Sequence, residues 1–434
     1  MFAVFCFVQC TATMSFAEPH WNQFRGPNGS GIASTDRVTM RLDPKVDALW
    51  RTETPDVGWS SPVTDGERIW ITSARTTEAS TEYKEAKLAN VAFAKMKDVA
   101  GTVELSSMCI DAKTGKVLLS LDLHKVDSPN PIHPMNCYAS PTAAIANDRV
   151  VVHFGRYGTW CLDSKTGKLL WHRELVFDDS VGPGSSPVIY QDKVLITCDG
   201  MDQQFVTALS LENGSEIWKT PRPTIDSTNE EFRKAYSTPL VIMVDGRTQA
   251  VIPGAQWCVA YDPNTGEEIW RASCGKGYST TPMPIYAEGL VIMSTGYLKP
   301  ELVAIDPRGR GDITSTHIAW RETKTAPLKP SMVSVGPRLF VISDTGIFSA
   351  LNVSDGRVIF RERLGGTYSA SPFVSGDNLV IADHDGKVSV IKASENYHLE
   401  SQFEFDEQIM ASPVPIGEDL LIRTKNALYR FGKK

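Results

Sequence analysis

A short motif that ends in Ser-Pro or Thr-Pro recurs along most of this chain and constrains its fold more than any other feature. In most copies an aromatic or small residue precedes small residues, then Ser or Thr, Pro and an apolar residue, as in Trp59-Ser-Ser-Pro62-Val. Seven copies place their proline at Pro62, Pro141, Pro187, Pro239, Pro282, Pro372 and Pro413. A degenerate copy, Lys329-Pro-Ser-Met332-Val, fills the gap between Pro282 and Pro372. The sequence therefore predicts eight structural repeats.

A second motif marks a tight turn within most repeats. The turns are Asp111 to Gly115, Asp163 to Gly167, Leu211 to Gly214, Asp262 to Gly266, Asp306 to Gly309 and Ser354 to Gly356. An Asp side chain accepts hydrogen bonds from turn amides, and Gly supplies the positive φ of a tight hairpin, so each copy indicates a strand-turn-strand junction. Trp171, Trp218 and Trp270 each lie four residues after the Gly, which places them on the outermost strand of the repeat.

Short runs of β-branched residues, such as 150–154 and 194–197, lie between the two motifs, so one period holds four strands. Spacings of roughly 40 to 52 residues are typical of propeller blades. We therefore expect an all-β fold, an eight-bladed β-propeller of four-stranded antiparallel blades over residues 47–434. The last repeat ends after three strands, and the segment 47–51, which carries Trp50, is expected to supply the fourth and close the ring.

The rest of the chain divides into three segments. Residues 1–17 end in Ser15-Phe16-Ala17 after an apolar stretch and are typical of a signal peptide, and residues 18–46 form an N-terminal extension. An insertion at about 78–100 interrupts the first blade between its second and third strands, and residues 80–98 are expected to form a helix. This helix either lies on the rim of the propeller or docks a partner. The mature chain has no apolar run long enough to span a bilayer, so we expect a periplasmic or extracellular protein.

Charge and cysteine content narrow the partners further. The net charge of −7 and the absence of a basic run interleaved with aromatics argue against a nucleic-acid partner. The sequence has no CxxC, no CxxCH for haem and no paired Cys/His spacing for zinc. Buried thiols are favoured over disulfides for the six cysteines outside the leader, which are Cys109, Cys137, Cys161, Cys198, Cys258 and Cys274.

The Asp-turn, Gly and Trp series with Ser-Pro strand starts resembles the pyrroloquinoline-quinone (PQQ) repeat, from about Trp50 to the end of the chain. The segment from Trp21 to Gly31 is similar to one found ahead of the first blade in secreted bacterial members of this family. The resemblance implies one of two functions. Quinoprotein dehydrogenases hold PQQ with calcium in the central funnel, beside a vicinal disulfide, whereas BamB-like propellers bind other envelope proteins without a cofactor.

The chain departs from the dehydrogenase pattern, since it has no Cys-Cys pair and no recognisable set of metal-ligating carboxylates. The loop from Asp199 to Gln204 supplies too few oxygens for calcium and is favoured as a polar turn. Aromatic residues just before the Ser-Pro motif, together with nearby lysines, are expected to ring one mouth of the channel and could bind a planar anion such as PQQ. The candidates are Trp59, Tyr138, Tyr236, Tyr278, Tyr368, Lys276 and Lys329, with Lys234 and His133 nearby. The alternative is that the rings pack between blades and the lysines are solvated.

We favour a monomeric binding or scaffold propeller of the cell envelope, whose partner is another envelope protein or a small ligand in the funnel. The alternative is a PQQ-dependent oxidoreductase acting on alcohols, sugars or polyols. The repeat specifies the architecture but not the function.

Overall fold

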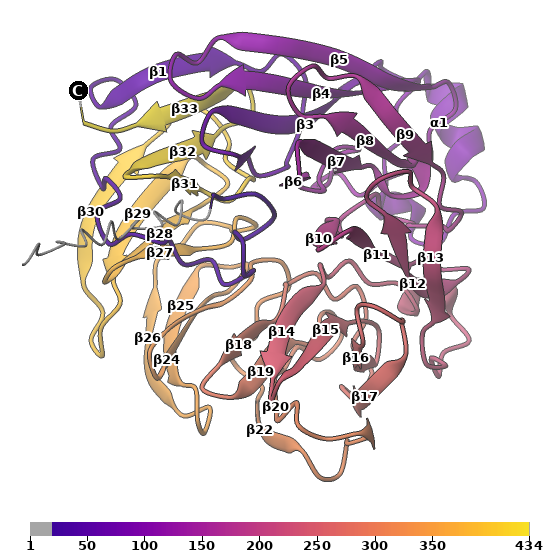
Figure 1. Ribbon diagram of the computed structural model, residues 1–434, viewed down its shortest axis with the longest axis vertical. Helices are drawn as coiled ribbons and strands as arrows, with labels where there is room; N and C mark the ends of the chain where they lie inside the picture. Colours follow the sequence, from indigo (N-terminus) through magenta and orange to yellow (C-terminus); the bar gives the residue numbers. More distant parts are fainter. Residues whose placement is uncertain (1–19, 434) are drawn as a thin grey trace, which may run out of the picture.

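The computed structural model describes residues 20 to 433, so the predicted signal peptide at 1–17 lies outside the described residues. Eight β-sheets follow one another around a central axis (Figure 1). The predicted all-β eight-bladed propeller of four-stranded antiparallel blades is confirmed. Among the described residues, every helix is too short or too polar to cross a membrane.

In the first seven blades the strands run in chain order from the axis outward, and in the eighth the N-terminal strand takes the outermost place. The first four blades comprise β2 (Val63–Thr64), β3 (Arg68–Thr76), β4 (Val103–Asp111) and β5 (Val117–Val126); β6 (Ala144–Ala146), β7 (Arg149–His153), β8 (Thr159–Asp163) and β9 (Leu169–Arg173); β10 (Val188–Tyr190), β11 (Lys193–Asp199), β12 (Gln204–Ser210) and β13 (Glu216–Pro221); and β14 (Leu240–Val244), β15 (Arg247–Pro253), β16 (Trp257–Tyr261) and β17 (Glu268–Ser273).

Blades five to seven comprise β18 (Ile285–Ala287), β19 (Leu290–Ser294), β20 (Leu302–Ile305) and β22 (Ile318–Glu322); β23 (Val333–Val335), β24 (Arg338–Ile342), β25 (Ile347–Asn352) and β26 (Val358–Arg363); and β27 (Phe373–Ser375), β28 (Asn378–Ala382), β29 (Lys387–Lys392) and β30 (Leu399–Glu404). The eighth holds β31 (Val414–Ile416), β32 (Asp419–Arg423), β33 (Ala427–Phe431) and β1 (Ala48–Glu53). A short strand, β21 (Gly311–Asp312), adds to the fourth blade in parallel with β17.

The ring closes where the sequence predicted. Strand β1 pairs antiparallel with β33, with Trp50 opposite Arg430, so the N-terminal strand forms the outer edge of the last blade. Closure pairs the first and last parts of the chain and leaves no terminal repeat with an uncovered face.

The tryptophans of the second motif join neighbouring blades. In four of them the indole N–H donates to a backbone carbonyl of the next blade at 2.8 to 3.1 Å. The pairs are Trp50 with Ala112, Trp171 with Leu211, Trp218 with Pro263, and Trp320 with Val353. Each indole covers the turn glycine of that blade, and a Cβ on Gly115 would lie only 2.7 Å from the ring of Trp50. Gly is therefore required both for its positive φ and for the room it leaves the indole.

One blade interface replaces this direct bond with a relay. Trp270 Nε1 donates to Gln249 Oε1 at 2.7 Å, and Gln249 Nε2 donates to the carbonyl of Pro307 at 3.0 Å. Pro307 follows Asp306 as Pro263 follows Asp262, so the relay ends on the equivalent turn carbonyl.

A belt of hydroxyl groups, here called the hydroxyl ring, joins the innermost strands around the axis. It lies two residues before each innermost strand and comprises Ser61, Thr142, Ser186, Thr238, Ser331, Ser371 and Ser412, with Met283 in the fifth blade. In seven steps the amide of one position donates to the hydroxyl oxygen of the next at 2.9 to 3.1 Å. Met283 has no hydroxyl, so the amide of Thr238 does not make the equivalent hydrogen bond to the fifth blade. In the second and fifth blades the proline comes two residues earlier relative to the strand, so these copies are offset from the others.

The N-terminal segment crosses the inner end of the channel. Trp21 accepts from the amide of Thr64, and Asn22 donates to the carbonyl of Ile145, both on innermost strands. The buried guanidinium of Arg25 donates to the carbonyls of Met332 and Pro372, and no carboxylate pairs with it among the described residues. Burial lowers the pKa of Arg25 to about 9. The segment thus ties together strands of several blades.

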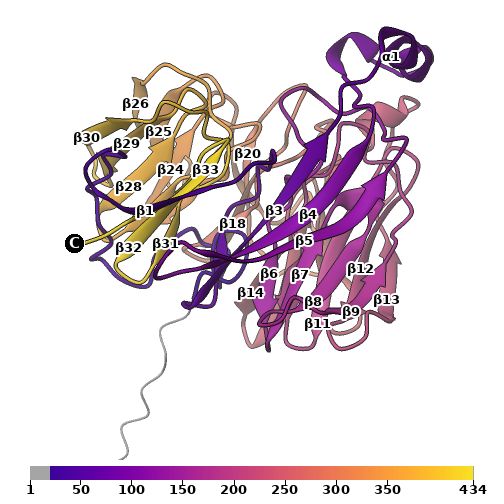
Figure 2. The same cartoon turned by 90° about the horizontal axis from the view of Figure 1, so that it is seen from above.

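The insertion lies between β3 and β4, the second and third strands of the first blade, but its helix is shorter than expected. Helix α1 covers only Thr81–Leu88, with Ser80 as its N-cap, and a single 3-10 turn follows at η1 (Ala94–Met96). No residue of α1 is buried, and the helix stands out on one face of the ring (Figure 2). The helix has no apolar face that packs against the propeller, so nothing stabilises further turns as far as Asp98.

The six cysteines from Cys109 to Cys274 are buried free thiols.

Replacing Gln249 with Met tests the relay. The variant keeps the shape of the side chain but leaves the Trp270 N–H and the Pro307 carbonyl without their partner, so we expect a loss of about 2 to 3 kcal/mol in the free energy of unfolding. Chemical denaturation measures it. The matched control is Thr248→Ala on the same strand, where the side chain is half-buried. Equal stability of the two variants would show that the relay does not stabilise this interface.

Candidate functional site: the capped central funnel

A cavity of about 340 Å³ opens above the hydroxyl ring at one mouth of the channel. The ring forms its base together with Phe24 of the N-terminal segment. A second set of residues, each two positions before the hydroxyl ring, faces the same space because alternate residues of an extended chain share a side. This wall set comprises Trp59, Ser140, Gly184, Tyr236, Thr281, Lys329, Ser369 and Met410.

The wall set explains where the predicted aromatic and basic residues lie. Trp59, Tyr236 and Lys329 belong to it, and Tyr278 reaches the cavity from the preceding loop. His133 and Lys234 line it as well.

Three candidates lie elsewhere. Tyr138 falls four residues before the hydroxyl ring because the proline is offset in the second blade, and its hydroxyl donates to the carbonyl of Asn130 at 2.8 Å. Tyr368 falls three residues before the ring and packs in a buried apolar cluster. Lys276 is exposed and is not one of the described residues that line the cavity.

The insertion forms part of the mouth of the cavity. Phe93 and Met96, around η1, line the mouth, and their exposed fractions are 50% and 56%. Met135 and Tyr297 complete an exposed apolar rim. Phe93 has a φ of 55°, a left-handed conformation that is unfavourable for a bulky side chain. The segment expected to lie on the rim thus also reaches over the funnel.

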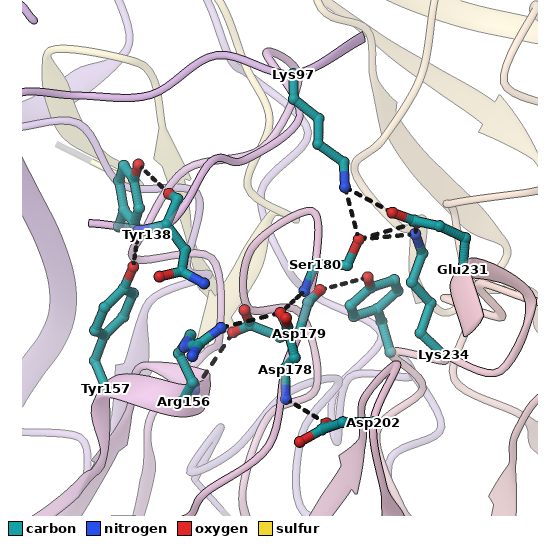
Figure 3. A network of polar contacts seen from close by, with 12 residues as sticks. Lys97, Tyr138, Arg156, Tyr157, Asp178, Asp179, Ser180, Asp202, Glu231 and Lys234 are labelled. Atoms are coloured by element: carbon teal, nitrogen blue, oxygen red, sulfur yellow. Dashed lines mark hydrogen bonds and ion pairs between the residues drawn. The ribbon is translucent and has the colours of Figure 1, made fainter. Parts of the chain in front are cut away.

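Lys97, which directly follows η1, enters a buried polar cluster at the side of the cavity (Figure 3). Its Nζ donates to Glu231 Oε1 at 2.7 Å and to Ser180 Oγ at 3.0 Å. Lys234 Nζ donates to Glu231 Oε2 and to the same Ser180 Oγ. The side chains of Lys97, Glu231 and Lys234 are only 2%, 3% and 4% exposed. Burial acts to raise the pKa of Glu231, but the hydrogen bonds from Lys234 and Lys97 outweigh it and hold the pKa below its usual range.

Behind this cluster lies a second acidic group. Asp178 pairs with Arg156 at 3.0 Å, whereas the buried carboxyl of Asp179 has no ion pair among the described residues and accepts a long bond from the Arg156 amide at 3.4 Å. Burial raises the pKa of Asp179 to about 7. The hydroxyl of Tyr236 donates to the Asp179 carbonyl at 2.7 Å, which fixes this loop against the cavity wall.

The sequence did not single out Lys97, Ser180 or Glu231. They come from the insertion and from two long loops that have no repeat pattern, and only Lys234, close to Tyr236, was noted. Ser180 has a φ of 59°, and Glu231 lies in η3 (Glu230–Phe232) behind the N-cap Asn229. An Asn or Ser cap followed by two glutamates is a weak signal that does not predict burial.

The lining residues do not fit PQQ with calcium. Calcium needs six or more oxygen ligands with several carboxylates, and Glu231 is the one carboxylate among the described lining residues. Both of its oxygens already accept from lysines. Within residues 20 to 433 no group of three or more His, Cys, Asp or Glu side chains could hold a metal ion. The loop at Asp199 is also occupied otherwise, since Asp199 pairs with Arg222 at 3.3 Å.

Comparison with known proteins agrees with the repeat. Residues 60–252, 203–312 and 299–396 match the family model described as outer membrane protein assembly factor BamB. The chain belongs to the BamB-like family of PQQ-repeat propellers. The family resemblance in the repeat is thereby confirmed.

Individual relatives span both functional groups. The BamB of Legionella pneumophila is 24% identical over 264 residues, which cover 59% of this chain and 51% of that protein. The quinoprotein ethanol dehydrogenase of Pseudomonas aeruginosa is 30% identical over 153 residues, 31% of this chain and 23% of that enzyme. This BamB-like chain thus aligns with about half of the Legionella protein and about a quarter of the dehydrogenase. The structure of a europium-containing methanol dehydrogenase superposes with a TM-score of 0.66 at 10% identity and covers 96% of this chain and 99% of that one, a likeness of fold.

Stability should depend on pH through Asp179. Because burial raises its pKa to about 7, the folded protein keeps a proton that the unfolded chain releases above about pH 4. The folded state therefore loses stability as pH rises from about 4 to about 7. We expect Asp179→Asn to be about 1 to 3 kcal/mol more stable than the wild type at pH 8, with little difference at pH 4. Urea denaturation at each pH measures this, with exposed Asp245→Asn as control. A pH-independent difference would contradict the assignment.

The lysine pair should make Glu231 essential to stability. Glu231→Gln leaves two buried ammonium groups without a counter-charge, and we expect a loss of about 3 to 5 kcal/mol in the free energy of unfolding. Lys97→Met should cost much less, because Lys234 still pairs with Glu231. The neighbouring exposed Glu230→Gln is the control. Similar losses for Glu231→Gln and Glu230→Gln would rule out a stabilising role for the buried cluster.

Proposed function

We propose that this chain is a non-catalytic binding propeller of the cell envelope and that the capped funnel mouth is its docking surface for another envelope protein. The observation that carries the proposal is the rim formed by Phe93, Met96, Met135 and Tyr297, four exposed apolar side chains gathered around one open cavity. Exposed apolar side chains that cluster at a concave site, rather than lying singly, are typical of binding surfaces.

The insertion is held firmly enough to present this rim. Lys84 pairs with Asp98 at 3.0 Å, the Tyr83 hydroxyl lies 3.2 Å from Ser128 Oγ, and Lys97 is anchored in the buried cluster. A fixed segment that holds Phe93 in a left-handed conformation and leaves it half-exposed is better explained by binding than by folding, since the fold gains little from it.

The comparisons support the same class of function. The matched family model and the Legionella relative both carry the description of an outer membrane assembly factor, which we extend to this chain as a location in the periplasm or outside the cell and as a protein partner. The predicted leader at 1–17 agrees with that location. We propose a monomer in the absence of the partner.

The second candidate, a PQQ-dependent oxidoreductase, is favoured by the partial match to an ethanol dehydrogenase. The funnel lining argues against this candidate, because Glu231 is the one carboxylate among the described lining residues and calcium needs several. We expect calorimetric titration of PQQ into the purified protein to give no calcium-dependent heat, and no dye reduction with alcohols, sugars or polyols. Calcium-dependent binding with turnover would replace the scaffold proposal by this one.

Site-specific photo-crosslinking in the native envelope tests the docking surface. A benzoylphenylalanine in place of Phe93 should crosslink to one defined envelope protein, because its side chain lies on the rim. The same residue in place of Leu170, which is exposed on the outer strand β9, should not. Met96→Asp should weaken binding of that partner at least tenfold, whereas Val176→Asp, also exposed but outside the cavity lining, should not. Equal crosslinking at both positions would overturn the proposal.

A further inference from the structure

The side wall of the funnel holds more positive than negative charge. Two ammonium groups, on Lys97 and Lys234, share the single carboxylate of Glu231 and the neutral hydroxyl of Ser180. The cluster therefore carries one net positive charge although its side chains are almost wholly buried. A buried charge without a counter-ion is costly, so such a site favours an anion.

Neighbouring groups do not supply the missing negative charge. Asp178 is paired with Arg156, and Asp344 is paired with Lys329, the other lysine of the cavity wall, at 3.3 Å. The carboxyl of Asp179 is turned to the Arg156 amide and has a pKa near 7.

The inner end of the channel holds a second buried cation. The guanidinium of Arg25 donates to the carbonyls of Met332 and Pro372, and no carboxylate pairs with it among the described residues. Burial lowers the pKa of His133 in the same cavity, and the charges of Lys329 and Lys234 lower it further. An anion that enters the funnel thus meets a favourable potential, despite the net charge of −7 on the chain.

Each ammonium group has a donor to spare. A lysine ammonium has three N–H groups, and Lys97 and Lys234 each donate to two acceptors within the described residues. Both residues also line the cavity. One carboxylate has two oxygens and can accept from both lysines at once.

The remainder of the cavity is suited to an apolar body. Phe24, Trp59, Tyr278 and Met96 contribute aromatic and thioether surfaces around the lysines. A volume of about 340 Å³ lies at the lower end of the range for small-molecule sites.

We propose that Lys97 and Lys234 form a binding site for the carboxylate of a small organic acid, whose apolar body lies against the aromatic wall of the funnel. Lys97 belongs to the insertion, so the bound acid also ties the cap to the propeller. This site is separate from the docking of a protein partner on the rim and does not require it.

The test uses 3-phenylpropionate and its neutral amide, 3-phenylpropionamide, which differ only in the charged group. Calorimetric titration of the full mature chain should show saturable binding of the acid and at least tenfold weaker binding of the amide. The acid, but not the amide, should also raise the melting temperature of the wild-type protein, a readout that needs no variant.

Lys97→Met and Lys234→Met should each reduce affinity for the acid at least tenfold, to the level of the amide. Either variant should remain folded, because the other lysine still pairs with Glu231, and circular dichroism checks this. The exposed Lys276→Met is the matched control and should bind as the wild type does. Equal binding of acid and amide, binding unchanged in both cluster variants, or no binding of the acid would each overturn the site. These three outcomes do not affect the crosslinking experiment at Phe93, which tests the protein-docking surface separately.

Discussion

The hydroxyl ring is the constraint on which the rest of this propeller depends. Each bond joins the backbone of one innermost strand to a side chain of the next, so the strands nearest the axis are held at a fixed separation. A buried amide without a partner would be costly, and the ring supplies one where sheets of different blades meet without pairing to each other. The wall set follows from it directly, since those residues lie two positions earlier in the extended segments that lead into the same strands.

Fixing the radius of the channel also fixes what it can contain. The ring leaves room for Phe24 and Arg25 at the inner end and for a cavity at the other. Arg25 and Arg423 donate to carbonyl and hydroxyl oxygens rather than to carboxylates, and burial lowers the pKa of both guanidinium groups. The inner end of the channel therefore carries the buried positive charge of Arg25, while the blades outside it are held by apolar packing and by tryptophan bonds to the turn of the next blade.

Prediction of the site from sequence succeeded where the repeat was regular and was incomplete where it was not. Trp59 and Tyr236 could be placed beside the cavity because they stand two residues before the hydroxyl ring in copies with the common spacing. Tyr138 could not, because the proline of its copy stands two residues earlier relative to the strand. Tyr138 therefore lies four residues before the hydroxyl ring rather than two, and it packs in a buried apolar cluster. A motif counted by its proline cannot reveal that offset, which is set by where the strand begins to pair.

The sequence by itself determined the number of blades, the strand order and the closure of the ring through Trp50. It could do so because turn glycines, Asp side chains and alternating apolar residues act over a few neighbours, and eight copies repeat the same signal. Only the tertiary structure decided that Lys97 of the insertion meets Glu231 and Lys234 inside the funnel. Those contacts join residues 134 and 137 positions apart through loops with no periodic pattern, so they depend on how the blades close around the axis and not on any local preference.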